Sequence, residues 1–274
     1  MSNSSTDPLY KQKIAGIFDQ SSPRYGEDCN AFFSYFAEQL VRPVQIPVTA
    51  QVLDIATGRG AVVKSLLNRN DFNGKITGID FSLKMIEETT KEMNTRQINN
   101  VQLLQMDAEN LSFPDNTFDY IFCGFGIFFL PNIDQALKGI LRVLKPGGRF
   151  AMSTWREKDF CQQAFKSTAA KFGVDQKITL YDFDKEPFIR ELLAKAGFTQ
   201  IQVVPDEYIQ VYPTLEDWFT SLWFHGSRGV MERLTPEQLT ELKKSLKNQL
   251  ESHMKSDGLH EKLKAYYTYS SKRV

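Results

Sequence analysis

The segment that most constrains the fold of this chain is VLDIATGRG, residues 52–60, where an apolar run ends in an acid and breaks into a glycine turn. Its apolar residues are typical of a buried parallel strand. Gly58 and Gly60 allow a tight turn that brings the backbone close to a ligand, and a helix is predicted from Ala61. A strand, a glycine turn and a helix in this order predict a nucleotide-type cofactor site.

The residues around these glycines discriminate between cofactors. A dinucleotide site has the pattern G-x-G-x-x-G, but Val63 occupies the position of the third glycine. Asp54 would repel a pyrophosphate, whereas it can accept hydrogen bonds from a cationic ligand. S-adenosylmethionine carries an ammonium and a sulfonium group and no phosphate. The turn therefore favours S-adenosylmethionine, although two glycines taken alone are a weak signal.

Two further acids follow predicted strands. GKITGID ends in Asp80, about twenty positions after Gly60, where an acid can accept hydrogen bonds from both ribose hydroxyls. The alternative is that Asp80 only precedes a helix capped by Ser82. VQLLQMDAENLSF predicts a third strand, after which Asp107 could receive an adenine amino group while the Ala108 amide meets a ring nitrogen. The alternative for Asp107 is a solvated loop acid.

The remaining strand and helix signals follow the order of an α/β domain. NTFDYIFCGFGIFFLPN predicts a strand that opens into an aromatic loop, and LRVLKPGGRFAMSTW predicts a helix end, a turn and a fifth strand. FIRELLAKAGF predicts a helix closed by Gly197 before a sixth strand, TQIQVVP. At the C-terminus, KLKAYYTYSSKRV favours a seventh strand.

Together these stretches resemble the class I S-adenosylmethionine-dependent methyltransferases, in particular the small-molecule branch with ubiquinone, menaquinone and natural-product enzymes. The resemblance is carried by VLDIATGRG, TGIDFSLKMIE, MDAENLSFPDNTFDYI and LRVLKPGGRF, and it covers residues 12–212 and the C-terminal strand. Ala56 departs from the glycine that many members have there. The resemblance implies a Rossmann-like seven-stranded α/β sheet of strand order 3-2-1-4-5-7-6, with the last strand antiparallel.

The resemblance also assigns roles to individual residues. It implies that Asp54 and the two glycines of the turn hold the methionine end of the cofactor, and that Asp80 holds the ribose. Asp107 and Ala108 would read the adenine, and the loop from Cys123 to Phe125 would lie beside the methyl group. The full set that we expect to bind the cofactor is Tyr25, Asp54, Ala56, Gly58, Gly60, Asp80, Phe81, Met85, Asp107, Ala108, Cys123 and Phe125.

Four segments organise the chain. Residues 1–45 are predicted to be an N-terminal helical arm, in which a polar turn separates a short helix from a longer amphipathic one. Such arms in the resembled family fold over the cofactor, so that Phe18 and Tyr25 are candidate lid residues; alternatively, Tyr25 is a half-buried turn aromatic. Residues 46–212 form the cofactor-binding core, residues 213–258 a helical cap and residues 259–274 the last strand of the sheet.

The cap carries the one candidate for a catalytic side chain. We interpret TLEDWFTSLWFHGSRGVMERL as a helix whose large aromatics suit an apolar acceptor pocket or, equally, pack the cap onto the core. Methyl transfer needs alignment and requires a base only where the acceptor must lose a proton. His225 is the candidate base, with a structural role as the alternative. With Arg228, it resembles a W-x-x-x-HG-x-R stretch of the natural-product branch.

Composition limits the partners. Thirty-three basic and thirty-three acidic side chains give no net charge, which argues against a nucleic-acid partner. No stretch approaches the roughly 20 consecutive apolar residues of a membrane span. Cys29, Cys123 and Cys161 are far apart, as in a reducing cytosol, and no metal-ligand spacing is present. We therefore expect a cytoplasmic protein with a small-molecule methyl acceptor and no metal.

Two other functions are compatible with parts of the sequence. A nicotinamide-dependent oxidoreductase would share the strand and turn, but the absent third glycine and the seventh strand count against it. A protein that binds S-adenosylmethionine without transferring methyl groups would keep the same motifs. The favoured function is transfer of a methyl group to a small aromatic or apolar molecule by in-line displacement.

Overall fold

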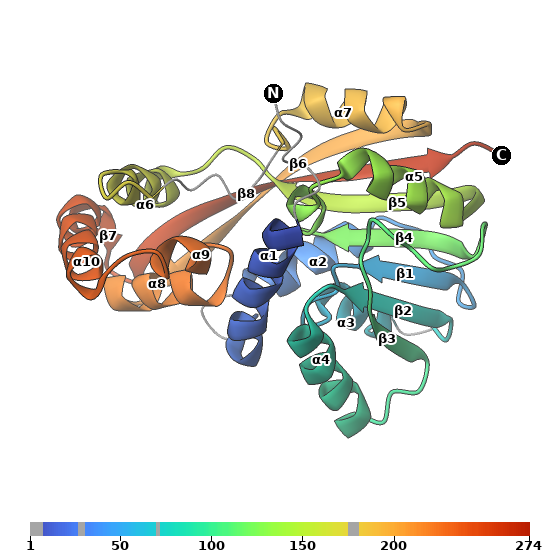
Figure 1. Ribbon diagram of the computed structural model, residues 1–274, viewed down its shortest axis with the longest axis horizontal. Coiled ribbons are helices and arrows are strands. Elements are labelled where there is room, and N and C mark those ends of the chain that lie inside the picture. The colour runs from blue at the N-terminus through green and yellow to red at the C-terminus, as the bar shows by residue number, and fades with distance from the viewer. Residues whose placement is uncertain (1–7, 27–30, 70–71, 175–180) are drawn as a thin grey trace.

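The computed structural model describes residues 8–26, 31–69, 72–174 and 181–274, which form a twisted sheet flanked by helices and a helical cap (Figure 1). The sheet has eight strands, and its main path is β3-β2-β1-β4-β5-β8-β6. The strands are β1 Gln51–Ile55, β2 Lys75–Asp80, β3 Val101–Gln105, β4 Phe118–Gly124, β5 Leu144–Trp155, β6 Phe198–Tyr212, β7 Met254–Lys255 and β8 Gly258–Lys272.

Strand pairing confirms the predicted α/β fold. β1 to β5 pair in parallel, and β8 inserts antiparallel between β5 and β6. The seven long strands thus have the predicted order, in which the last strand of the sequence lies between the fifth and the sixth. The difference is the two-residue strand β7, which pairs with β8 and lies off the main path. Because Asp54 pairs with Gly78, the carboxyl ends of β1 and β2 lie side by side.

The helices begin and end largely where the sequence predicts. Ser82 caps α4 through a hydrogen bond from the Met85 amide, and Thr235 caps α10 with Gln238 in a capping box. Gly197 follows α7 with a φ of +99°, a conformation that favours glycine. The helices are α1 Pro8–Ser21, α2 Phe32–Val41, α3 Ala61–Leu67, α4 Leu83–Thr95, α5 Ile133–Val143, α6 Phe160–Ala170, α7 Glu186–Lys195, α8 Leu215–Ser221, α9 Arg228–Met231 and α10 Pro236–Leu250.

Two local predictions were wrong. The first helix of the arm is the longer one, with 14 described residues in α1 against 10 in α2. The aromatic segment of the cap is not one helix but α8, a 3₁₀ turn and α9. The chain is extended at His225, whose Nδ1 accepts a hydrogen bond from the Ser227 amide. This bond and Gly226 both compete with helix formation.

Among the described residues, the buried hydrophobic side chains form two clusters. The main core joins the strands to the inner faces of α2, α3, α5 and α7. The cap has its own core, made by α6, α8, α9 and α10 around Trp218 and Tyr212. The far ends of β6 and β8 extend beyond the other strands and carry the cap (Figure 1). The long antiparallel pair therefore fixes the cap beside the carboxyl ends of the parallel strands.

The structure also describes two of the three cysteines and the helices that could be compared with a membrane span. Cys123 and Cys161 are buried free thiols, whereas Cys29 lies outside the described residues. No helix among the described residues is long and apolar enough to cross a membrane.

Candidate functional site

Two adjoining cavities are lined by residues at and after the carboxyl ends of the parallel strands, and the larger is also lined by α1. Figure 1 shows α1 beside these strand ends. The larger has a volume of about 790 Å³ including its open mouth, and the smaller about 650 Å³. Both lie within the range of small-molecule sites. The two cavities share part of their walls and therefore adjoin each other. The shared residues are Tyr25, Ala56, Gly58, Gly124 and Phe125.

The glycine turn after β1 has the left-handed backbone that its sequence predicts. Gly58 and Gly60 have φ values of +51° and +73°. Ala56, the departure from the glycine of many related enzymes, is also left-handed at φ +54° and thus carries some strain. A Cβ atom on Gly126 would lie 2.3 Å from the Ala56 Cβ. The loop after β4 therefore packs directly onto the turn, and only glycine fits at position 126.

Asp54 is the most unusual polar group of the site. Its side chain is 1% exposed, and its Oδ2 accepts a hydrogen bond of 2.6 Å from the Thr57 hydroxyl. No described residue donates a hydrogen bond to the buried Oδ1 atom. Burial raises the pKa of Asp54 to about 7, which the Thr57 hydrogen bond opposes and the nearby charge of Asp80 reinforces. Since Asp54 lines the smaller cavity, a cationic ligand group there would satisfy it.

Asp80 holds the turn and also faces the larger cavity. Its Oδ2 accepts a hydrogen bond of 2.8 Å from the Gly58 amide, and its Oδ1 accepts one of 2.9 Å from the Ser82 amide. Burial raises the pKa of Asp80 to about 6 against the effect of these bonds. The two interpretations of Asp80 are therefore compatible, because a carboxylate can order the backbone and still accept hydrogen bonds from a ligand.

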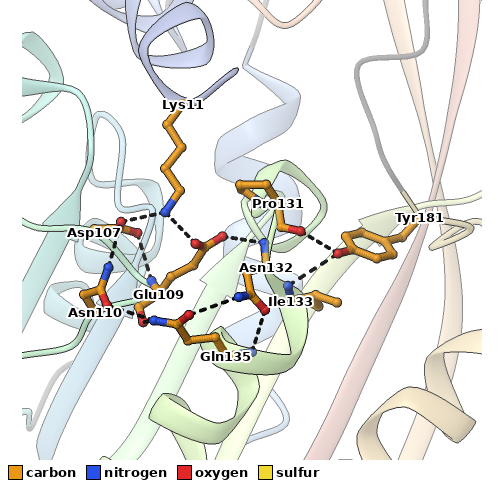
Figure 2. A network of polar contacts seen from close by, with 9 residues as sticks. All are labelled: Lys11, Asp107, Glu109, Asn110, Pro131, Asn132, Ile133, Gln135 and Tyr181. Atoms are coloured by element: carbon orange, nitrogen blue, oxygen red, sulfur yellow. Dashed lines mark hydrogen bonds and ion pairs between the residues drawn. The ribbon is translucent and has the colours of Figure 1, made fainter. Parts of the chain in front are cut away.

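Asp107 belongs to a polar network at the far end of the larger cavity (Figure 2). Lys11, from α1, forms ion pairs with Asp107 at 2.7 Å and with Glu109 at 2.5 Å. Glu109 accepts a hydrogen bond from the Asn132 amide, which links the segment after β3 to the start of α5. Asp107 is therefore a partly exposed, ordered carboxylate rather than a loop acid in free solution.

Most of the predicted cofactor residues meet at these cavities. The larger is lined by Tyr25, Ala56, Gly58, Asp80, Phe81, Met85, Asp107, Ala108 and Phe125, and the smaller also by Asp54. Gly60 and Cys123 line neither. A Cβ on Gly60 would approach the Thr89 methyl group to 3.0 Å, so this glycine permits close packing. The Cys123 thiol is buried in the core, where burial raises its pKa, and Gly124 takes its expected place at the wall.

That α1 lines the larger cavity was not predicted from the sequence, except for Phe18 as a candidate lid residue. Lys11, Ile14, Ala15 and Phe18 all line the larger cavity. Their spacing of three and four places them on one face of the helix. That spacing was visible in the sequence, but nothing in it showed that the ligand, rather than the core, would lie opposite this face.

The cavity walls are aromatic. Phe125, which has a left-handed φ of +53°, stacks on Trp155 with ring centroids 4.0 Å apart. Tyr25 stacks on Phe33 with ring centroids 4.8 Å apart, and Phe18 and Phe129 pack edge to face with centroids 5.2 Å apart. A strained, non-glycine residue in such a loop is typical of a functional position. Flat ring faces of this kind suit an apolar or aromatic ligand.

The aromatic residues of the cap have another role. Trp218 is 1% exposed in the core of the cap, and Arg24 lies over the Phe224 ring at 4.5 Å. None of the cap aromatics among the described residues lines either cavity. The interpretation that they pack the cap therefore fits better than a substrate pocket.

His225 does not line either cavity. It is half-buried, and burial lowers its pKa to about 4, so the ring is neutral at physiological pH. Because Nδ1 accepts a hydrogen bond of 3.3 Å from the Ser227 amide, the proton of the neutral ring resides on Nε2. In this tautomer Nε2 is a donor and cannot accept a proton. The geometry thus favours the structural alternative for His225 over a general base.

Arg228 connects the cap to the arm. Its guanidinium donates hydrogen bonds to the Gln20 side chain at 2.7 Å and to the Trp223 carbonyl at 3.2 Å, and it pairs with Glu232 at 2.6 Å. A Cβ on Gly229 would lie 2.5 Å from Ile17 of α1. The HGSR stretch therefore fixes the position of the arm.

Comparison with known proteins identifies a family model and several relatives that match this chain. The protein-family model described as the ubiE/COQ5 methyltransferase family matches residues 7–196. Aklanonic acid methyltransferase DauC from Streptomyces sp. (strain C5) is 37% identical over 149 residues, which cover 54% of this chain and 67% of the relative. Demethylmenaquinone methyltransferase from Staphylococcus haemolyticus (strain JCSC1435) is 28% identical over 216 residues, covering 70% and 88%.

Solved structures share the fold. The YcgJ protein from Bacillus subtilis matches with a TM-score of 0.62 at 17% identity, covering 88% of this chain and 99% of that chain.

We expect Asp54→Asn to stabilise the unliganded protein at alkaline pH. The folded pKa of about 7 exceeds the ordinary value of 3.8, so the folded state binds more protons than the unfolded chain between these values. Its stability therefore falls as pH rises through this window. Since asparagine does not titrate, its advantage over the wild type should grow by roughly 2–4 kcal/mol between pH 4 and pH 8.

Urea unfolding at pH 4, 6 and 8 measures this difference, with the exposed Asp115→Asn as the control. A difference between Asp54→Asn and the wild type that does not change with pH would contradict the raised pKa of the buried Asp54.

Proposed function

Because the chain belongs to the ubiE/COQ5 methyltransferase family and is therefore an S-adenosylmethionine-dependent methyltransferase, we propose that it methylates a small aromatic or otherwise apolar molecule. The observation that carries this proposal is the aromatic wall beside a buried acid, at two adjoining cavities. The names of the relatives, which specify aklanonic acid and demethylmenaquinone, support a small-molecule acceptor.

The residues at the strand ends fit the groups of S-adenosylmethionine. The free Oδ1 of Asp54, to which no described residue donates, would accept a hydrogen bond from the ammonium group. Asp80 would accept hydrogen bonds from the ribose, and Asp107 with the Ala108 amide would bind the adenine. The bound sulfonium supplies a methyl group already activated for displacement. Met85 and Phe81 line the same cavity and would contact the adenosine.

The protein's own contribution to the transfer is alignment of the acceptor. Phe125 lies at the junction of the two cavities and is held by Trp155 and by hydrogen bonds from its amide to Ser153. A planar acceptor stacked there would be fixed in orientation and shielded from water. Positioning of two reactants is worth up to about 7–11 kcal/mol of the barrier. An enzyme of this kind needs no catalytic base unless its acceptor is a weak acid.

We place the enzyme in the cytoplasm, acting on a small molecule without a nucleic-acid partner. Equal numbers of acidic and basic side chains support the absence of a nucleic-acid partner. The buried free thiols Cys123 and Cys161 support a reducing compartment.

We expect Phe125→Leu to weaken acceptor binding more than cofactor binding, because Phe125 lines both cavities and its ring is proposed to face the acceptor. Leucine keeps the apolar character but loses the ring face, which is worth about 0.5–1.5 kcal/mol, or roughly 2–13-fold in KM for an aromatic acceptor. The dissociation constant for S-adenosylhomocysteine, which Phe125 is also expected to contact, should rise by a smaller factor, because the cofactor keeps its proposed polar contacts with Asp80 and Asp107. Transfer of labelled methyl groups to 1,4-naphthalenediol measures the first quantity, and calorimetry measures the second.

Phe160→Leu, on the exposed surface of the cap, is the matched control. Methylation of glycine or another polar amine in preference to aromatic acceptors would contradict the proposed substrate class.

A second prediction concerns His225, which the sequence suggests as a base. Because its pKa is about 4 and its Nε2 carries the proton, His225→Gln should leave the pH dependence of kcat unchanged between about pH 6 and pH 9. The measurement is kcat across this range for folded wild-type and variant enzymes. Loss of a titration step near neutrality in the variant would restore His225 as the general base.

A further inference from the structure

Lys11 stands out because it is a cation placed in a cofactor cavity. Among the described residues it is the only basic side chain that lines the larger cavity. Figure 2 shows its ammonium group reaching from α1 to a point between the carboxylates of Asp107 and Glu109. The two contacts are 2.7 Å and 2.5 Å long, and the Lys11 side chain is only 20% exposed. These are short, charge-assisted contacts at a partly desolvated position.

The hydrogen bonds of Asp107 leave room for a ligand. Its Oδ2 accepts hydrogen bonds from Lys11 and Asn110, and its Oδ1 accepts one from the Glu109 amide. A carboxylate offers about four acceptor sites. One site thus stays available for the adenine amino group without displacement of Lys11. The ammonium group neutralises charge at the acid that the adenine would contact.

Glu109 is a second partner of Lys11, and it is not one of the residues proposed to contact the adenine. Its side chain is 5% exposed, and its other oxygen accepts a hydrogen bond of 2.6 Å from the Asn132 amide. Glu109 is thereby fixed to the start of α5. Because one partner of Lys11 is rigid and the other faces the cavity, the ion pair ties α1 to the adenine end of the site.

The rest of α1 is positioned by the same contact. Ile14 and Phe18 lie on the cavity wall one and two turns after Lys11. At the other end of the helix, Asp19 accepts hydrogen bonds from the Ser82 hydroxyl and the Lys84 amide at the start of α4. The arm therefore crosses the cavity between two polar anchors. Lys11 is the anchor that includes a predicted ligand contact.

We propose that Lys11 is a positioning residue of the cofactor site, which holds α1 over the cavity and shares the Asp107 carboxylate with bound adenine. This inference rests on the proposed placement of adenine at Asp107. The ion pair closes the arm over the cofactor, and bound adenine completes the hydrogen bonds of the same carboxylate. Loss of Lys11 leaves two carboxylates close together without their cation, and it frees the N-terminal half of α1.

The test compares the wild type with Lys11→Gln, Lys11→Arg and Lys13→Gln. Lys13 is exposed on the same helix and serves as the matched control. Lys11→Gln should accelerate dissociation of S-adenosylhomocysteine about tenfold and raise KM for S-adenosylmethionine by a similar factor. The kcat at saturating cofactor should stay within about twofold, since Lys11 is paired with Asp107 and Glu109 and the acceptor is proposed to lie at Phe125. Lys11→Arg should restore most of the loss because it keeps the cation.

Hydrogen exchange of α1 supplies a readout that a merely structural role would not produce. In the wild type, S-adenosylhomocysteine should slow amide exchange across residues 12–20, and Lys11→Gln should lose this ligand-dependent protection while its thermal unfolding stays cooperative. Glu109→Gln should give an intermediate effect, because Asp107 still binds Lys11.

The outcomes separate the inference from the function on which it rests. Failure of the wild type to bind S-adenosylhomocysteine would overturn the proposed placement of the cofactor. Normal binding by the wild type, with unchanged dissociation rate, KM and α1 protection in Lys11→Gln, would overturn the role of Lys11 alone. Equal effects of Lys11→Gln and Lys13→Gln would also overturn it.

Discussion

The site depends on two neighbouring carboxylates, the buried Asp54 and the half-buried Asp80, at the ends of adjacent parallel strands. Burial of charge is unfavourable, and it raises the pKa of both groups. Part of this cost is offset by hydrogen bonds from the Thr57 hydroxyl and from the Gly58 and Ser82 amides. A ligand that brings positive charge and hydroxyl groups to the cavity would offset the rest of this cost. The cofactor would thus complete the hydrogen bonds of carboxylates that the fold already holds in position.

The other parts of the molecule enclose these acids. The left-handed turn after β1 and Gly126 after β4 let two loops pack against each other beside the acids. The arm covers the cavities and is held by Lys11 and Asp19, while Arg228 ties it to the cap. The cap extends from the long β6 and β8 pair, and most of its aromatic residues pack in its own core. The aromatic walls of the site come instead from the arm and from the loop after β4.

The strands of the sheet and the positions of the acids at the strand ends could be predicted from the sequence, because both follow from local patterns. Apolar strands that end in an acid, the glycine turn and the caps at Ser82 and Thr235 follow from short-range preferences. The roles of Lys11 and the cap aromatics were not predictable in the same way, since they depend on which elements meet across the fold. His225 illustrates the limit. Its residue type suggested a base, but burial and the Ser227 amide determine its charge and tautomer.

The most direct test of the account is calorimetric titration of the wild type and Asp80→Ala with S-adenosylmethionine, S-adenosylhomocysteine and NAD. We predict that both adenosyl ligands bind the wild type, that Asp80→Ala weakens them by at least about tenfold through loss of a charged hydrogen-bond acceptor, and that NAD does not bind. Binding of NAD in preference to the adenosyl ligands, or adenosyl binding that is indifferent to Asp80→Ala, would contradict the account of the buried acids as the cofactor site.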